Sequence, residues 1–217
     1  MIYGEKFLIT ESKEDKINDY NKLIELSKKN IDLEFKELDK RTKYFLEVFN
    51  ILKSINQNNY KNTLDKALSK IQSYKSSYNH DTEWRDLKSK YGGGLFNFNN
   101  FKFMYNTPEN NSNVEYFKKE LDKLKDIVKK FEDTTYKDML KFASDKEKEF
   151  KNKGIMNYNP FDKTTNDFGE ESDYNAIEDL IEVAYKQLPW TTSTTMLHDF
   201  ESIFKALGRK DIDIYNN

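Results

Sequence analysis

The residues best suited to chemistry are two histidines and the acids beside one of them. His80, Asp81 and Glu83 place three types of metal-binding side chain within four positions. At the start of a helix these side chains fan outward and do not converge on one ion, so we expect them to cap and solvate the helix. His198 lies far from His80 in the sequence, and no Ser or Cys nucleophile motif is present. The sequence therefore predicts a protein that is not an enzyme.

Two other motifs have a structural interpretation that is simpler than a chemical one. Gly92, Gly93 and Gly94 are not followed by the Gly-Lys-Ser/Thr of a phosphate-binding loop, so we expect them to end a helix. Asp211 and Asp213 would share one face of a strand and could hold a cation there, but an exposed acidic tail is the favoured interpretation. We predict no metal, no cofactor and no small-molecule substrate.

The composition indicates a folded, helical protein. Charged residues make up 34% of the 217 residues and apolar residues 36%, which is close to the range of disordered chains, but the 15% of aromatic residues are enough to fill a core. Cysteine is absent, which excludes disulfides and thiolate metal sites. Residues 1–10 lack the apolar run of a signal peptide, and no stretch approaches the ~20 apolar residues of a membrane span. We expect no contact with a membrane.

The charge is uneven along the chain. Residues 1–153 carry 31 basic and 26 acidic groups, whereas residues 154–217 carry 5 basic and 12 acidic groups. Lys outnumbers Arg 33 to 3 and Asn occurs 23 times, as in proteins of AT-rich genomes, so the lysines are weak support for nucleic-acid binding. A helix pair at 173–188 and 194–207 has helix-turn-helix spacing, but Asp199 and Glu201 would repel phosphate. We therefore predict that nucleic acid is not a partner.

The rest of the chain is organised around a predicted helix at residues 13–56. A second line of residues, three positions after each member of its apolar line, is apolar at its ends and polar in its middle. We interpret this as a bundle helix with different neighbours at its two ends, either continuous or broken near Asn30. The apolar line is Ile17, Ile24, Ile31, Leu38, Phe45 and Leu52, and the second line is Tyr20, Ser27, Glu34, Arg41, Val48 and Ile55.

Capping residues and apolar spacing predict the remaining helices. Ser12 with Asp15 resembles a capping box for the long helix. We expect Thr63 to cap a second helix, and Asn113 to cap a fourth that is interrupted at 133–135 and then continues, with Tyr136 and Leu140 inward, to Gly154. Shorter helices are predicted from residue 82 to the glycines, at 173–188 and at 194–207.

One stretch has the alternation of a β-strand. Phe96 and Phe98 precede Asn99 and Asn100, and Phe101, Phe103 and Tyr105 follow them at alternate positions, which predicts a β-hairpin at about 95–105. The hairpin either covers the core of its own chain or projects as an aromatic tongue into a partner.

These patterns predict a mainly α fold: an elongated helical bundle built on long, heptad-patterned helices, with one β-hairpin. Residues 1–153 form the bundle, and residues 154–217 form a linker and a small acidic helical pair, either separate or packed on the first part as one domain. We expect a structural or adaptor protein that forms homo-oligomers or binds neighbouring proteins. Opposite charges in its two parts suit a ring, connector or tail component of a virus or phage particle, located in the virion or the cytoplasm.

The alternative is a small intracellular regulator that blocks a target protein through its acidic C-terminal part. For either function, the predicted contact residues are the aromatic residues of the hairpin, two lysine pairs and an acidic cluster. They are Phe96, Phe98, Phe101, Phe103, Tyr105, Lys118, Lys119, Lys129, Lys130, Glu170, Glu171 and Asp173.

Overall fold

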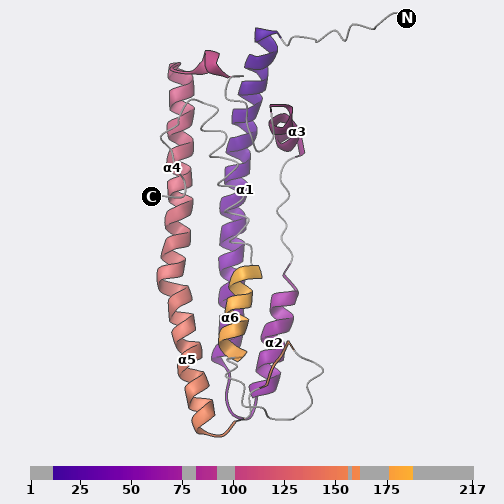
Figure 1. The fold of residues 1–217 in the computed structure, drawn as a ribbon, viewed down its shortest axis with the longest axis vertical. Helices are drawn as coiled ribbons and strands as arrows, with labels where there is room; N and C mark the ends of the chain where they lie inside the picture. The colour runs from indigo at the N-terminus through magenta and orange to yellow at the C-terminus, as the bar shows by residue number, and fades with distance from the viewer. Residues whose placement is uncertain (1–11, 75–81, 92–100, 156–157, 162–175, 188–217) are drawn as a thin grey trace, which may run out of the picture. The chain divides into compact units, whose positions relative to one another are not determined.

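The computed structural model describes residues 12–74, 82–91, 101–155, 158–161 and 176–187. All the regular structure in these ranges is helical, which confirms the mainly α class and fits a helical bundle (Figure 1). The elements are α1 (Lys13–Lys53), α2 (Tyr60–Gln72), α3 (Thr82–Lys90), the 3₁₀-helix η1 (Lys102–Met104), α4 (Pro108–Phe131), the π-helix η2 (Glu132–Tyr136), α5 (Lys137–Asn152) and α6 (Ala176–Gln187).

Helix α1 is continuous over 41 residues. Its first turn is closed by the predicted capping box: the Asp15 N–H donates to Ser12 Oγ at 3.0 Å, and the Ser12 N–H donates to Asp15 Oδ2 at 3.1 Å. The alternative break near Asn30 is wrong, because Asn30 lies inside the helix and donates from Nδ2 to the Leu26 carbonyl at 2.7 Å. The helix ends at Lys53, three residues before the predicted end.

Both predicted lines of α1 face inward. In the apolar line all members are buried except Ile17, which is half-buried. The polar middle of the second line is buried as deeply as its apolar ends: Ser27 and Arg41 are fully buried and Glu34 is 1% exposed. A helix with this pattern must find polar partners for its buried side, because an unpaired buried charge is costly.

The described chain falls into two compact units. The first takes its described residues from 12–33, 82–91 and 101–120, and its core holds Trp84, Phe101 and Phe117. The buried Tyr20 hydroxyl donates to Asn110 Oδ1 on α4 at 3.1 Å, so a polar contact joins the two helices inside this core.

The second unit takes its described residues from 34–74, 121–155, 158–161 and 176–187. At its centre Phe45 of α1 lies edge-on to Phe131, with 5.2 Å between ring centroids, and near Tyr136 and Tyr185. Helix α6 packs on α5 and α2. This unit thus contains residues from both sides of position 153.

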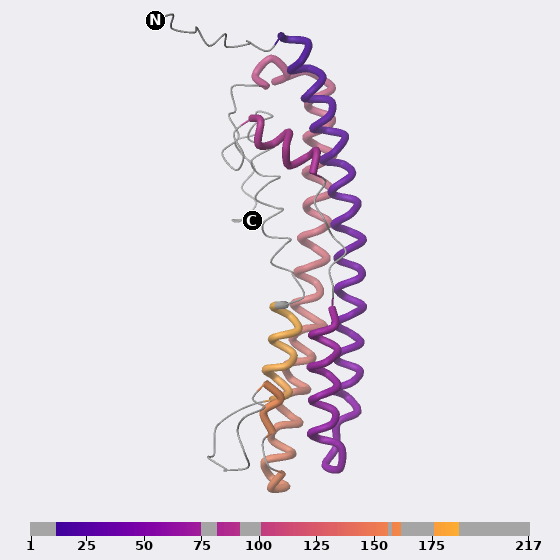
Figure 2. The backbone as a smooth tube through the Cα atoms, turned by 90° about the vertical axis from the view of Figure 1, so that its right-hand side faces the viewer, coloured from indigo at the N-terminus to yellow at the C-terminus, as the bar shows by residue number. Residues whose placement is uncertain are grey.

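A π-helix joins α4 to α5 where an interruption was predicted (Figure 2). The chain stays helical, but the wider turn shifts the inward face of α5. Met139 is buried in place of the predicted Leu140, which is half-buried, and Ala143 and Phe150 further along α5 are also buried. Gly154 then ends the helix with φ +67°, and the Ile155 N–H donates back to the Phe150 carbonyl at 3.0 Å.

Three predicted helix starts differ from the structure or lie outside its described part. Helix α2 begins at Tyr60, and Thr63 is buried within its first turns. Helix α4 begins at Pro108, five residues before Asn113, because proline suits the first turn of a helix. The described residues do not include 173–175, where the helix predicted at 173–188 would start, nor the helix predicted at 194–207, nor residues 80–81 and 92–94.

The β-hairpin predicted at 95–105 is wrong. Its described residues, Phe101 to Tyr105, form a turn and the 3₁₀-helix η1, and no strand occurs in the described ranges. The Met104 N–H donates to the Phe101 carbonyl at 2.9 Å, three residues back, which is 3₁₀ geometry. In this turn the two buried side chains are Phe101 and Met104, which are three positions apart as 3₁₀ geometry requires, and not every second residue as in a strand.

Candidate interaction surfaces

The predicted aromatic contact residues that the structure describes pack within the first unit. Phe101 is fully buried, with its ring centroid 4.8 Å from that of Tyr91 and 6.2 Å from that of Tyr20. Phe103 and Tyr105 are half-buried, and burial raises the pKa of the Tyr105 hydroxyl. Phe101 therefore serves the core of its own chain. Phe96 and Phe98 lie outside the described residues.

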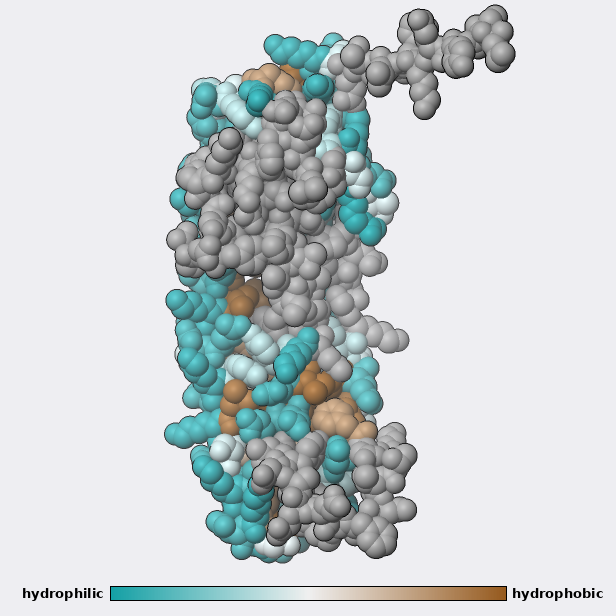
Figure 3. Space-filling view, in the orientation of Figure 1, coloured by the Kyte–Doolittle hydropathy of each residue, from teal (hydrophilic) through white to brown (hydrophobic). Residues whose placement is uncertain are grey.

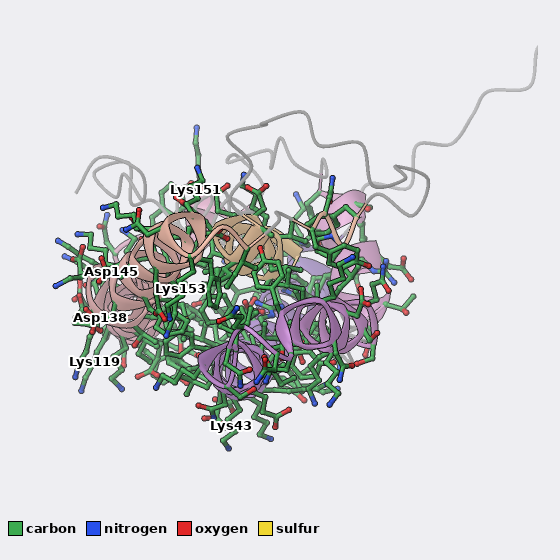
Figure 4. All side chains as sticks on the ribbon, turned by 90° about the horizontal axis from the view of Figure 1, so that it is seen from below. Lys43, Lys119, Asp138, Asp145, Lys151 and Lys153 are labelled. Atoms are coloured by element: carbon green, nitrogen blue, oxygen red, sulfur yellow. The ribbon has the colours of Figure 1, made fainter. Side chains whose placement is uncertain are left out.

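The two lysine pairs lie on the exposed side of α4. Lys118, Lys119, Lys129 and Lys130 are all exposed, and Lys119 points into open space in Figure 4. Eleven residues separate the first pair from the second, which is close to three helical turns, so both pairs lie on one side of the helix. Acids lie between them, so this face carries mixed charge. The acidic candidates Glu170, Glu171 and Asp173 lie outside the described residues.

In the first unit, the polar inward side of α1 is bound by α3. The indole N–H of Trp84 donates to Ser27 Oγ at 3.0 Å, and both residues are fully buried. The Lys88 ammonium lies 3.7 Å from the centre of the Trp84 ring, a cation–π contact. At the rim, Lys90 Nζ lies 2.6 Å from Asp19 Oδ2. A short polar helix thus meets a polar stretch of α1.

In the second unit, a buried ionic cluster occupies the same side of α1. Arg41 Nη1 lies 3.2 Å from Glu34 Oε1, and Arg41 Nε lies 3.7 Å from Glu37 Oε1. The Tyr74 hydroxyl, just beyond α2, donates to Glu37 Oε1 at 2.5 Å. Burial and the Glu37 carboxylate raise the pKa of Tyr74, so this hydroxyl keeps its proton. The cluster ties the end of α2 to α1.

Aromatic and basic side chains surround this cluster. The Tyr44 ring lies edge-on to Tyr74 at 4.8 Å, and the Tyr44 hydroxyl donates to the Lys70 carbonyl at 2.5 Å. Lys40 lies 5.6 Å from the centre of the Tyr74 ring, and Lys70 forms an ion pair with Glu47 at 2.5 Å. These contacts hold the carboxylates of the cluster in place.

The opposite, exposed side of α1 carries a regular array of charges that the sequence predictions missed. Acids and bases alternate at intervals of four and three residues, and all six side chains are exposed. We call this array the α1 stripe. The signal was in the sequence: acids recur every seven residues and so do bases, in the same period as the buried apolar line. The stripe consists of Glu25, Lys29, Asp32, Lys36, Asp39 and Lys43.

Other surface features agree with a polar exterior. The described residues on the face shown in Figure 3 are mostly hydrophilic, with small hydrophobic areas between them. The large apolar residues that are exposed in the described ranges are Leu46, Ile127 and Phe161. No group of three or more metal-binding side chains gathers among the described residues, and none of the described helices is long and apolar enough to cross a membrane.

The fold and these surfaces define an α-helical protein whose long helix has a buried, internally paired side and an exposed, charged side. Comparison with protein-family models, curated proteins and solved structures finds no match to this chain.

Proposed function

We propose that this chain is a non-enzymatic structural or adaptor protein that assembles with copies of itself and with other proteins into a larger complex. The observation that carries this proposal is that the two sides of α1 have different contacts. Its inward polar residues take partners such as Trp84 and Tyr74 from their own chain, while its outward side presents an ordered stripe of charges. A helix built in this way supports partners on its outer face without giving up its own core contacts.

The finer form of the proposal is a ring, connector or tail component of a virus or phage particle. Its support comes from the sequence: residues 1–153 carry an excess of basic groups and residues 154–217 an excess of acidic groups. Opposite charges on two parts of one chain favour head-to-tail contact between copies, and such contacts close into rings when the rotation between neighbours closes.

The test is the molar mass of the purified full chain, measured by light scattering across protein concentration at about 0.02 M and about 0.5 M salt. We expect a defined oligomer of the 25.9 kDa chain at low salt and a smaller mass at high salt, because salt screens exposed charges. A monomer at every concentration and ionic strength would overturn self-assembly and would favour the inhibitor alternative. In that case charge reversal at Glu178 and Asp179 should weaken binding to the target.

A further inference from the structure

The α1 stripe has a symmetry that bears on which partner it fits. Its six charges alternate in sign from Glu25 to Lys43, and they lie on one continuous helix, so their mutual spacing follows from α1 alone. Steps of four and three residues keep them on one narrow side of the helix. In Figure 4 the last of them, Lys43, points away from the body of helices.

The stripe is complementary to itself when reversed. Consider two antiparallel α1 helices that are aligned at residue 34. Each residue of one helix then faces the residue of the other whose number, added to its own, gives 68. Every acid of the stripe then faces a base, and further out two exposed asparagines face each other. The facing pairs are Glu25 with Lys43, Lys29 with Asp39, Asp32 with Lys36, and Asn18 with Asn50.

Other arrangements of two stripes fit less well. Two parallel helices in register would place each acid opposite the same acid, which is repulsive. Sliding the antiparallel helices by one heptad in either direction leaves four of the six stripe residues facing an opposite charge within the stripe. The charge pattern therefore selects both a direction and a register, as charged heptad positions do in helix pairs.

We propose that a second copy of this chain binds the α1 stripe, with the two α1 helices antiparallel about a two-fold axis at the level of residue 34. This rests on the proposed self-assembly and specifies its contact. Exposed ion pairs are individually weak and are screened by salt, so the association is reversible and sensitive to ionic strength.

The same residues also pair within the helix, as Lys43 Nζ does with Asp39 Oδ2 at 2.6 Å. Ion pairs within one helix stabilise that helix and do not require a second copy of the chain. The test must therefore separate lost helix stability from lost association. Circular dichroism at 222 nm on each variant measures the first, and light scattering at low salt measures the second.

Two charge-uniform variants remove the complementarity. The basic variant carries Glu25→Lys, Asp32→Lys and Asp39→Lys, and the acidic variant carries Lys29→Glu, Lys36→Glu and Lys43→Glu. Each variant alone should lose self-association, with a dissociation constant raised about tenfold or more, because like charges then face each other. An equimolar mixture of the two variants should restore a complex at low salt.

Two controls accompany these variants. Reversing all six charges keeps the pattern self-complementary, so this variant should associate with itself. The variant with Lys66→Glu, Lys141→Glu and Lys148→Glu changes three exposed lysines of α2 and α5, as many as the acidic variant changes in the stripe, and should leave association through the stripe intact.

The antiparallel direction can be tested by cross-linking, because the chain has no cysteine of its own. A mixture of Lys29→Cys and Asp39→Cys chains should form a disulfide-linked heterodimer under oxidation, since these positions face each other. Lys29→Cys alone should not cross-link, because its two copies lie ten residues apart, about 15 Å along the helix. Efficient cross-linking of Lys29→Cys alone would overturn the antiparallel arrangement.

The outcomes separate this inference from the proposed function. Oligomers that persist in both charge-uniform variants would overturn the stripe contact while leaving assembly through another surface in place. A wild-type chain that is monomeric under all conditions would overturn both. Loss in each variant with recovery in the mixture would support both.

Discussion

The guanidinium of Arg41 lies 3.2 Å from the carboxylate of Glu34, two helical turns away on the same face of α1, and both side chains are at most 1% exposed. At this depth each charge is stabilised by the neighbouring side chains and not by water. Removing one partner leaves the other charge buried, which is far more costly than losing an exposed pair.

We therefore expect Arg41→Leu to lower the free energy of unfolding by about 3–5 kcal/mol. The matched control is Lys43→Leu, two positions along the same helix and 70% exposed, which should change stability by about 0.5 kcal/mol or less. Urea unfolding followed by circular dichroism measures both. Equal effects of the two substitutions would show that the Arg41 cluster does not hold α1 in place.

Glu147 should make stability depend on pH. Its Oε1 accepts the Ile177 N–H at 2.9 Å at the start of α6, and the side chain is 2% exposed. Burial raises the pKa of Glu147 above the ordinary 4.5, although the bond from Ile177 and the charge of Lys151 oppose this, while Asp179 and Glu178 add to it. Because the folded pKa exceeds the unfolded one, the stability that the protonated acid contributes is present below pH 4.5 and is lost as the pH rises through the folded pKa.

Glu147→Gln keeps an acceptor for Ile177 but cannot ionise. The variant should therefore gain stability relative to the wild type as the pH rises above 4.5, measured as the difference in urea midpoints between pH 4 and pH 7. A difference that stays constant across this range would contradict the raised pKa.

Glu149, two residues away, should behave in the opposite sense. Its partly exposed carboxylate accepts from Lys146 at 2.8 Å and from Lys153 at 2.5 Å, and these bonds lower the pKa to about 2. Its contribution is present above pH 4.5 and is lost as the pH falls through about 2. Glu149→Gln should thus cost stability near neutral pH and much less at pH 2. A larger cost in acid would reverse the sign and refute this assignment.

Phe45 should be a major contributor to the core of the second unit. Its ring is 1% exposed and contacts Phe131, Tyr136 and Tyr185, so Phe45→Ala should cost about 3–5 kcal/mol through lost burial and a residual cavity. Its neighbour Leu46 is 39% exposed, and Leu46→Ala should cost about 1 kcal/mol or less. Thermal unfolding monitored at 222 nm distinguishes the two, and a similar loss for both would place Phe45 outside the core.

The sequence by itself determined the helical class, the direction in which α1 faces and several helix ends. A seven-residue apolar interval is incompatible with a strand, and the buried residues from Ile24 to Leu52 follow it. The capping box at Ser12 and Asp15 and the stop at Gly154 are local, since their hydrogen bonds join residues at most five positions apart. Features set by near neighbours can be predicted from sequence.

Only the tertiary structure determines which partners the polar residues on the inward side of α1 contact. Arg41 is buried in a cluster that Tyr74 completes, and the buried Ser27 accepts a hydrogen bond from Trp84. In the chain, Tyr74 lies 37 residues from its partner Glu37, and Trp84 lies 57 residues from its partner Ser27. No local pattern connects residues so far apart.

Tertiary structure also decided the two places where periodicity misled. The aromatic alternation at Phe101 to Tyr105 predicted a strand, but the packing of Phe101 between Tyr20 and Tyr91 selected a 3₁₀ turn. The π-helix before α5 turned Met139 inward in place of Leu140. In both cases local periodicity allows more than one backbone conformation, and burial against residues from other elements selects one of them.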